Sequence, residues 1–138
     1  MTFFPFPTRL YVKLFYDITE VGLLQSLIIE RSDNSNYGKW EFLGGKMMMN
    51  ESITESIERE IYEELSIKVK GTKKLFESSI QINEKLYNLI FVHCKYISGQ
   101  IDLKEHLNYK WINVKQLNVY DFLSGDLEFI NQWNKDDI

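Results

Sequence analysis

The sequence predicts an α/β or α+β sandwich, and its length of 138 residues is that of one domain. Three observations support this prediction: several segments have the composition of strands, one stretch changes to the period of a helix, and no linker or internal repeat divides the chain. Hydrophobic residues make up 44% of the chain and charged residues 26%, a globular balance that excludes a disordered tail. Strands combined with two or three helices are expected to pack in layers.

Apolar segments rich in β-branched and aromatic residues mark the predicted strands. Residues 10–16 and 23–29 form the first two, with a turn at 17–22 between them. The later strand-like segments are 40–43, 67–69, 75–82, 86–96 and 109–112, with a hairpin turn at 83–84.

A change in the spacing of apolar residues along the chain predicts the main helix. Ile53, Ile57 and Ile61 recur every four residues within 51–65, which places them on one helical face. A second helix is expected to close the chain at 126–133.

The main helix carries glutamates where an apolar residue is expected. On a helical wheel Glu64 falls about 20° from the centre of the isoleucine stripe, and Glu60 and Glu63 lie on the same side. Like charges at these spacings destabilise a helix by about 0.2–0.5 kcal/mol per pair. A divalent cation would offset this repulsion, and such hard oxygen ligands suit Mg²⁺. From this helix alone, a solvated acidic face with internal salt bridges is the alternative.

Charge and cysteine content exclude several classes of protein. The net charge is −4, from 16 basic and 20 acidic residues, and no basic stripe suits duplex nucleic acid. No apolar run approaches the roughly 20 residues that span a bilayer, so no membrane partner is expected. The lone Cys94 cannot form an internal disulfide, which favours a cytoplasmic protein.

The helix and the loop before it share a spacing of fixed residues. Gly45 is followed after five residues by Glu51, and after seven more by the run Arg59-Glu60-Ile61-Tyr62-Glu63-Glu64-Leu65-Ser66-Ile67. This segment resembles the Nudix box: Gly, five residues, Glu, seven residues, Arg-Glu, an aliphatic, any residue, Glu-Glu, any residue, Gly, an aliphatic. Every fixed position matches except Ser66, which replaces the final Gly, so a somewhat different helix exit is expected there.

The resemblance implies a single Nudix hydrolase domain over residues 1–138, with a Nudix-type α/β/α sandwich, a mixed central sheet and the Nudix loop-helix-loop. Nudix hydrolases cleave a nucleoside diphosphate linked to another moiety, using Mg²⁺ or Mn²⁺ and a water. Carried over by position, Arg59 braces the carboxylates, and the general base is either Glu63 or Glu105 of the loop before the last strand. The implied metal ligands are the Gly45 carbonyl, Glu60, Glu63 and Glu64.

The segment Trp40-Glu41-Phe42-Leu43-Gly44-Gly45-Lys46 resembles the signature of the MutT-like branch, with Leu43 in place of a proline. That branch converts nucleoside triphosphates, such as 8-oxo-dGTP or (d)CTP, to the monophosphate and pyrophosphate. The implied substrate contacts are Arg31 and Lys46 on phosphate, Phe42 against the base and Asp126 on the base edge. An exposed arginine, core packing of Phe42 and a helix N-cap at Asp126 are the structural alternatives.

Two other functions stay open from the sequence. The first is a Nudix hydrolase for another diphosphate, such as a nucleotide sugar, a dinucleotide or capped RNA. The second is a non-catalytic Nudix domain that senses a nucleotide, although such domains usually lose box carboxylates and this sequence retains them all. The expected protein binds a nucleotide substrate and is either a monomer or a homodimer.

Overall fold

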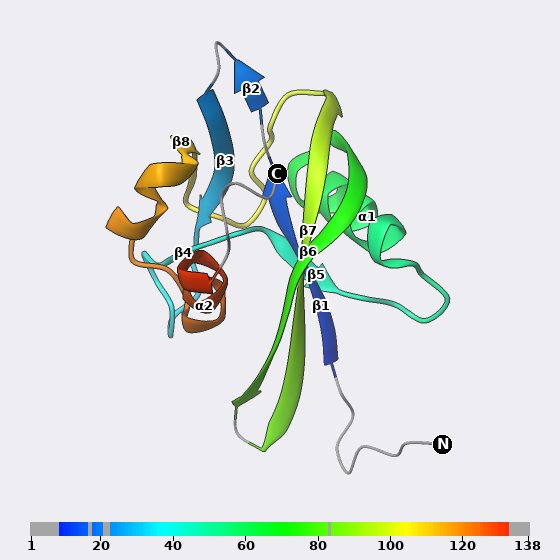
Figure 1. Ribbon diagram of the computed structural model, residues 1–138, viewed down its shortest axis with the longest axis vertical. Helices are drawn as coiled ribbons and strands as arrows, with labels where there is room; N and C mark the ends of the chain where they lie inside the picture. The colour runs from blue at the N-terminus through cyan, green and yellow to red at the C-terminus, as the bar shows by residue number, and fades with distance from the viewer. Residues whose placement is uncertain (1–8, 17, 21–22, 83, 133–138) are drawn as a thin grey trace.

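The computed structural model describes residues 9–16, 18–20, 23–82 and 84–132, whose strands form two sheets (Figure 1). Sheet A has the order β5 (Gly44–Lys46), β1 (Arg9–Tyr16), β7 (Lys85–Ser98) and β6 (Lys68–Ile82). Sheet B is built on β3 (Leu23–Glu30), which pairs with β2 (Ile18–Glu20), β4 (Trp40–Glu41) and β8 (Asn108–Asn113). The helices are α1 (Ile53–Leu65), the 3₁₀ helix η1 (Val114–Val119) and α2 (Ser124–Gln132).

Strand direction confirms the predicted α+β class. In sheet A, β1 runs parallel to β7, whereas β5 and β6 are antiparallel to their neighbours, so the sheet is mixed. Parallel neighbours need a long crossover, and the chain between β1 and β7 contains α1.

Apart from shifts of one or two residues at strand ends, the strands differ from the prediction in three places. Except for Ile67, the segments predicted at 67–69 and 75–82 belong to one strand, β6, whose pairing with β7 shifts register three times. These irregularities interrupt the alternation that marks a strand in a sequence. The predicted turn at 17–22 contains β2, and the glycine pair expected in a loop belongs to β5. Of the predicted turn at 83–84, only Glu84 lies within the described residues, and its φ of 67° is typical of a turn.

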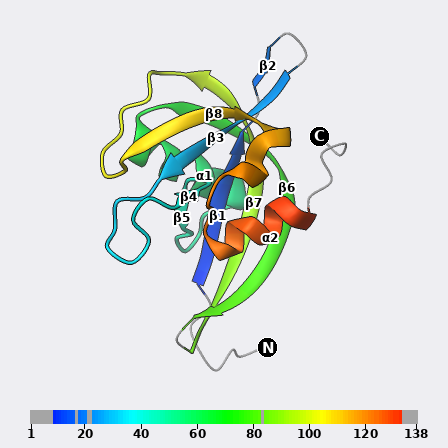
Figure 2. The same cartoon turned by 90° about the vertical axis from the view of Figure 1, so that its left-hand side faces the viewer.

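The core lies on both faces of β7, because its side chains alternate between two clusters. Ile90, Val92 and Cys94 pack with the apolar face of α1, whereas Leu89 and Phe91 pack with α2. Figures 1 and 2 accordingly show α1 on one side of sheet A and α2 on the other. This arrangement gives the predicted α/β/α layers. No helix within the described ranges is long and apolar enough to cross a bilayer.

Helix α1 is capped at both ends. At its start, the Ser52 side chain accepts from the Glu55 N–H at 3.1 Å, while the Glu55 carboxylate accepts from the Ser52 N–H at 3.0 Å. This reciprocal capping box satisfies two of the donors that a helix start leaves unpaired. The caps therefore fix where the box glutamates stand along the helix.

Contact between α1 and β6 depends on a close backbone approach at Gly71. A Cβ atom there would lie 2.9 Å from the Thr54 side chain, and the Gly71 N–H donates to the Glu58 carboxylate at 3.0 Å. These two contacts hold the first turns of α1 against β6.

The helix exit at Ser66 corrects one expectation from the sequence. Ser66 has φ 61° and ψ 23°, and its N–H donates to the Tyr62 carbonyl at 2.9 Å. This is the left-handed C-cap that a glycine would make, so serine does not change the exit. The capping hydrogen bond outweighs the steric cost of the side chain.

Replacing Ser66 with glycine is expected to stabilise the protein by about 1 kcal/mol, because glycine adopts positive φ without a Cβ penalty. A gain of that size raises Tm by a few degrees in a domain of this length. Thermal denaturation followed by circular dichroism would measure the shift, with Ser66→Ala as the control that keeps a Cβ. An equal gain in Ser66→Ala would contradict the explanation.

Candidate active site

The first part of the Nudix box, residues 45–52 (the box loop), meets helix α1 (the box helix) at Gly45. This residue lies in β5, paired with Val12 of β1, and a Cβ atom built on it would lie 2.2 Å from the Glu60 carboxyl carbon. Only glycine lets the Glu60 carboxylate rest against the strand backbone. The fixed glycine and the fixed glutamate are therefore placed by one contact.

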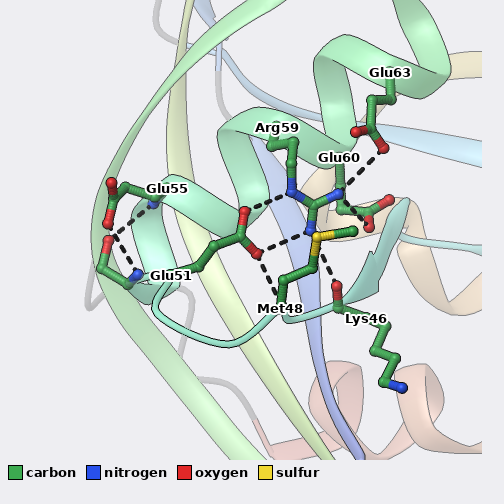
Figure 3. A network of polar contacts seen from close by, with 8 residues as sticks. Lys46, Met48, Glu51, Glu55, Arg59, Glu60 and Glu63 are labelled. Atoms are coloured by element: carbon green, nitrogen blue, oxygen red, sulfur yellow. Dashed lines mark hydrogen bonds and ion pairs between the residues drawn. The ribbon is translucent and has the colours of Figure 1, made fainter.

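Arg59 lies at the centre of a network that joins the helix to the loop (Figure 3). Its guanidinium holds both oxygens of Glu51, with Nε at 2.5 Å and Nη2 at 3.0 Å. Nη1 donates to Glu60 at 3.0 Å and to Glu63 at 3.2 Å, and Nη2 also donates to the Lys46 carbonyl at 3.1 Å. The bracing role predicted for Arg59 agrees with these contacts, since a bidentate guanidinium fixes geometry.

The network shifts the titration of its members in opposite directions. Hydrogen bonds from Arg59 and from the Met48 N–H lower the pKa of Glu51 to about 2. The hydrogen bond to Glu51 raises the pKa of the Arg59 guanidinium. Burial raises the pKa of Glu60, and the charges of Glu63 and Glu64 act in the same direction. Glu60 is thus a half-buried carboxylate whose negative charge is only partly compensated.

A Glu51→Gln variant is expected to lose stability most clearly near neutral pH. Folding lowers the pKa of Glu51 from 4.5 to about 2. The stability that this carboxylate contributes is therefore fully present above pH 4.5 and is lost as the pH falls towards 2. Denaturant unfolding of both proteins at pH 7 and at successively lower pH would measure this. The difference between them should shrink as pH falls, and a constant difference would contradict the assigned cause.

A cavity of about 450 Å³ opens beside the box helix. Four of the residues predicted from the sequence line it: Arg31, Glu64, Glu105 and Asp126. The other predicted residues are not among its lining residues: Phe42, Gly45, Lys46, Arg59, Glu60 and Glu63. In Figure 3 the Lys46 side chain points away from Arg59, so this lysine is linked to the network only by its carbonyl.

A hydrogen bond joins Phe42, in the core, to Asp126, which lines the cavity. The Phe42 side chain is fully buried and contacts Phe91, Phe122 and Phe129, so it packs in the core, the alternative that the sequence left open. Its backbone N–H donates to Asp126 Oδ2 at 2.8 Å. Asp126 is buried in the first turn of α2, two residues after the helix begins, so the N-cap alternative is wrong. The carboxylate tethers α2 to the chain beside β4.

A buried carboxylate that was not selected from the sequence also lines this cavity. Glu41 is 5% exposed and accepts from Arg31 Nη1 at 2.7 Å, while His106 Nε2 lies 3.9 Å from the same oxygen. Asp33 binds Arg31 Nε at 2.6 Å. Burial lowers the pKa of Arg31, but the hydrogen bond to Asp33 and the charge of Glu41 outweigh it, so the pKa is raised. The sequence feature that could have indicated Glu41 is its position between two aromatic residues at 40 and 42.

The donor set of the box suits a hard divalent cation. Among the described residues, no three acidic, His or Cys side chains lie close enough to hold a metal as they stand, since Arg59 draws in Glu60 and Glu63. Mg²⁺ needs fewer: one or two carboxylates, with waters and substrate phosphates completing its octahedron. The partly compensated Glu60, the neighbouring Glu64 and the Gly45 backbone meet that requirement.

Comparison with known proteins identifies the family. A model of the NUDIX domain matches residues 20–133. This chain belongs to the Nudix hydrolase family. Nudix hydrolases generally need a divalent metal, in agreement with the acidic helix. A protein of Buchnera aphidicola (subsp. Schizaphis graminum) named 8-oxo-dGTP diphosphatase is 34% identical over 96 residues, covering 70% of this chain and 72% of that protein.

Further relatives confirm the MutT-like resemblance. The CTP pyrophosphohydrolase of Escherichia coli K12 is 25% identical over 105 residues, which cover 75% of this chain and 78% of that enzyme. The MutT protein of Methanosarcina mazei Go1 superposes with a TM-score of 0.79 at 25% identity, covering 97% of this Nudix chain and 98% of the other. The fold is also that of the E. coli ORF135 protein, whose solution structure gives the same TM-score at 21% identity, covering 91% and 88% of the two chains.

Proposed function

We propose that this Nudix hydrolase is a Mg²⁺-dependent nucleoside triphosphate pyrophosphohydrolase. Its substrate is an oxidised or non-standard nucleotide such as 8-oxo-dGTP, or (d)CTP, and its products are the monophosphate and pyrophosphate. The observation that carries the proposal is one cavity lined by the box residue Glu64 and by the buried Asp126. A nucleotide lying across it would present phosphates to α1 and its base to α2.

The residues around the phosphates have complementary roles in this proposal. Glu60, Glu63, Glu64 and the Gly45 carbonyl would hold the metal, whose charge offsets that of the polyphosphate and lowers the pKa of a bound water. Arg59 keeps Glu60 and Glu63 within reach of that site through its two bonds from Nη1. Water attacks phosphorus, the anhydride bond between the α- and β-phosphates breaks, and the departing product takes the bridging oxygen. Either Glu105, at the cavity wall, or Glu63, on the helix, would take the water's proton.

The Glu105 backbone is held beside the cavity by contacts with the end of β3. Its carbonyl accepts from the Ser32 hydroxyl, and the Leu107 N–H donates to the Glu30 carbonyl at 3.0 Å. The Glu105 side chain itself is exposed at the rim. This anchoring supports the loop carboxylate as a base, because a general base must be held within reach of the water.

Asp126 supports the proposed choice of nucleobase. An ionised carboxylate only accepts hydrogen bonds, and one Asp126 oxygen already accepts from the Phe42 N–H. The site would therefore favour a base edge that presents N–H donors, such as the amine of cytosine or the amine and ring N–H groups of an oxidised guanine. The two named relatives, an 8-oxo-dGTP diphosphatase and a CTP pyrophosphohydrolase, support the same pair of bases.

Hydrolysis of 8-oxo-dGTP, dGTP, dCTP, 5-methyl-dCTP and ADP-ribose with Mg²⁺ tests the proposal. We expect kcat/KM to be highest for one of the triphosphates, with monophosphate and pyrophosphate as products and no turnover in excess EDTA. If ADP-ribose alone is cleaved, the assignment of a triphosphate substrate is wrong. Binding of nucleotides without cleavage of any would indicate a sensor.

A further inference from the structure

Glu41 has an unusual place for a carboxylate. It lies in β4 opposite Ile29 of β3, is almost fully buried, and still lines the nucleotide cavity. Burying a carboxylate is unfavourable unless it is paired, and Arg31 supplies the partner at 2.7 Å. A buried ion pair gives little net stability compared with apolar residues of the same volume. The pair is therefore better explained by the geometry it imposes on the cavity wall.

The contacts of Arg31 show what that geometry is. A guanidinium carries five N–H donors in a rigid fork. Nε donates to Asp33 and Nη1 donates to Glu41, whereas Nη2 makes no hydrogen bond to the described part of the chain. Glu41 thus holds Nη1 at the cavity wall from the buried strand β4, whereas the more exposed Asp33 binds the Nε side of the fork outside the cavity lining. Because Arg31 lines the cavity, its Nη2 N–H groups are the donors that an anion bound there would meet.

His106 occupies the other side of the same carboxylate. Its Nε2 lies 3.9 Å from the Glu41 oxygen that binds Arg31, and its Nδ1 has no hydrogen-bond partner in the described residues. His106 and Arg31 both line the cavity. One buried acid therefore lies between two basic side chains that face the nucleotide site.

We propose that Glu41 is a positioning residue, which orients Arg31 to bind a phosphate oxygen of the nucleotide and fixes the His106 ring beside it. This proposal rests on the proposed function of the cavity as a nucleotide site. Glu41 itself would not touch the phosphate, since both are anionic. Its loss should therefore weaken nucleotide binding more than it slows the chemical step.

Asp33 provides a matched control because it binds the same guanidinium. Its side chain is 38% exposed and is not among the residues that line the cavity. In Glu41→Gln we expect KM to rise about tenfold, the loss typical of one charge-assisted hydrogen bond, with kcat within a few-fold of wild type. In Asp33→Asn we expect less than about a threefold change, as for other exposed ion pairs.

A double-mutant cycle separates positioning from a merely structural role. Arg31→Lys should raise KM about as much as Glu41→Gln, and the double variant should be little worse than either, because the two residues act as one unit. The thermal midpoint of Glu41→Gln should stay close to wild type. Additive effects in the cycle, a loss confined to kcat, or equal losses in Asp33→Asn and Glu41→Gln would each overturn the proposal.

Calorimetric titration with dGMP and dCMP makes the test independent of turnover. If wild type binds a nucleotide more tightly than Glu41→Gln but cleaves no triphosphate, the pyrophosphohydrolase assignment fails and the positioning role stands. If wild type cleaves a triphosphate and both proteins bind its monophosphate equally, the positioning role fails alone. If wild type neither binds nor cleaves, both are overturned.

Discussion

A Glu64→Gln variant is expected to lose about 10²–10³-fold in kcat while folding normally. Glu64 is the box glutamate that lines the cavity, so its charge lies nearest the proposed phosphate site. Glu64 would act through the metal that it helps to hold, because that cation offsets the phosphate charge. Removing one group that stabilises transition-state charge costs about this factor in other enzymes. The side chain makes no hydrogen bond or ion pair within the described residues, and its loss removes repulsion along α1. Steady-state kinetics with the best triphosphate, beside thermal denaturation, would measure both effects.

Glu55→Gln is the matched control for this prediction. It removes the same charge from the same helix, and glutamine can replace glutamate in a capping box. We expect its kcat to stay within about twofold of wild type, as for surface changes away from the site. A Glu64→Gln protein with near-wild-type turnover would show that the metal assignment is wrong. An equal loss in both variants would instead indicate a general effect of the helix charge.

The box helix could be predicted closely because its signals are local. The isoleucine period placed the helix at 51–65, and the structure begins it at Ile53 after the Ser52 cap. Glu64 also lies on the same side of the helix as Glu60 in the structure, because the 3.6-residue repeat fixes which residues are neighbours. A local pattern was enough here because every interaction it describes lies within a few turns of chain.

The cavity could not be predicted in the same way, because distant segments build it. Glu41, Tyr87 and Ser124 line one space although they come from β4, β7 and α2. Their proximity depends on the register of β3 with β4 and on the Trp40 N–H donating to the Asp121 carbonyl at 2.8 Å. No spacing in the sequence reports such pairings. The resemblance to a known signature predicts a substrate contact at Asp126, and the structure adds its hydrogen bond from the Phe42 N–H.

Replacing Gly45 with alanine is expected to abolish most activity at little cost in stability. The backbone at Gly45 lies outside the positive-φ region, so alanine causes no strain of that kind. Its Cβ would lie 2.2 Å from the carboxyl carbon of Glu60, which is the end of a flexible side chain and can turn away. Turning away breaks the 3.0 Å bond to Arg59 and removes the carboxylate from the proposed metal site. A displacement of about 1 Å in such a group can cost on the order of 10²-fold in rate.

The double variant Gly45→Ala/Glu60→Gln tests this cause directly. If glycine is needed to make room for the Glu60 carboxylate, the alanine should cost little more once that carboxylate is gone, because both changes remove the same interaction. Titration of Mg²⁺ against thermal stability gives a second measurement, since a metal that binds only the folded protein raises Tm. Both single variants should lose most of that rise. Additive losses in kcat, or a full Mg²⁺-dependent rise in Gly45→Ala, would show that this glycine serves the strand backbone and not the carboxylate beside it.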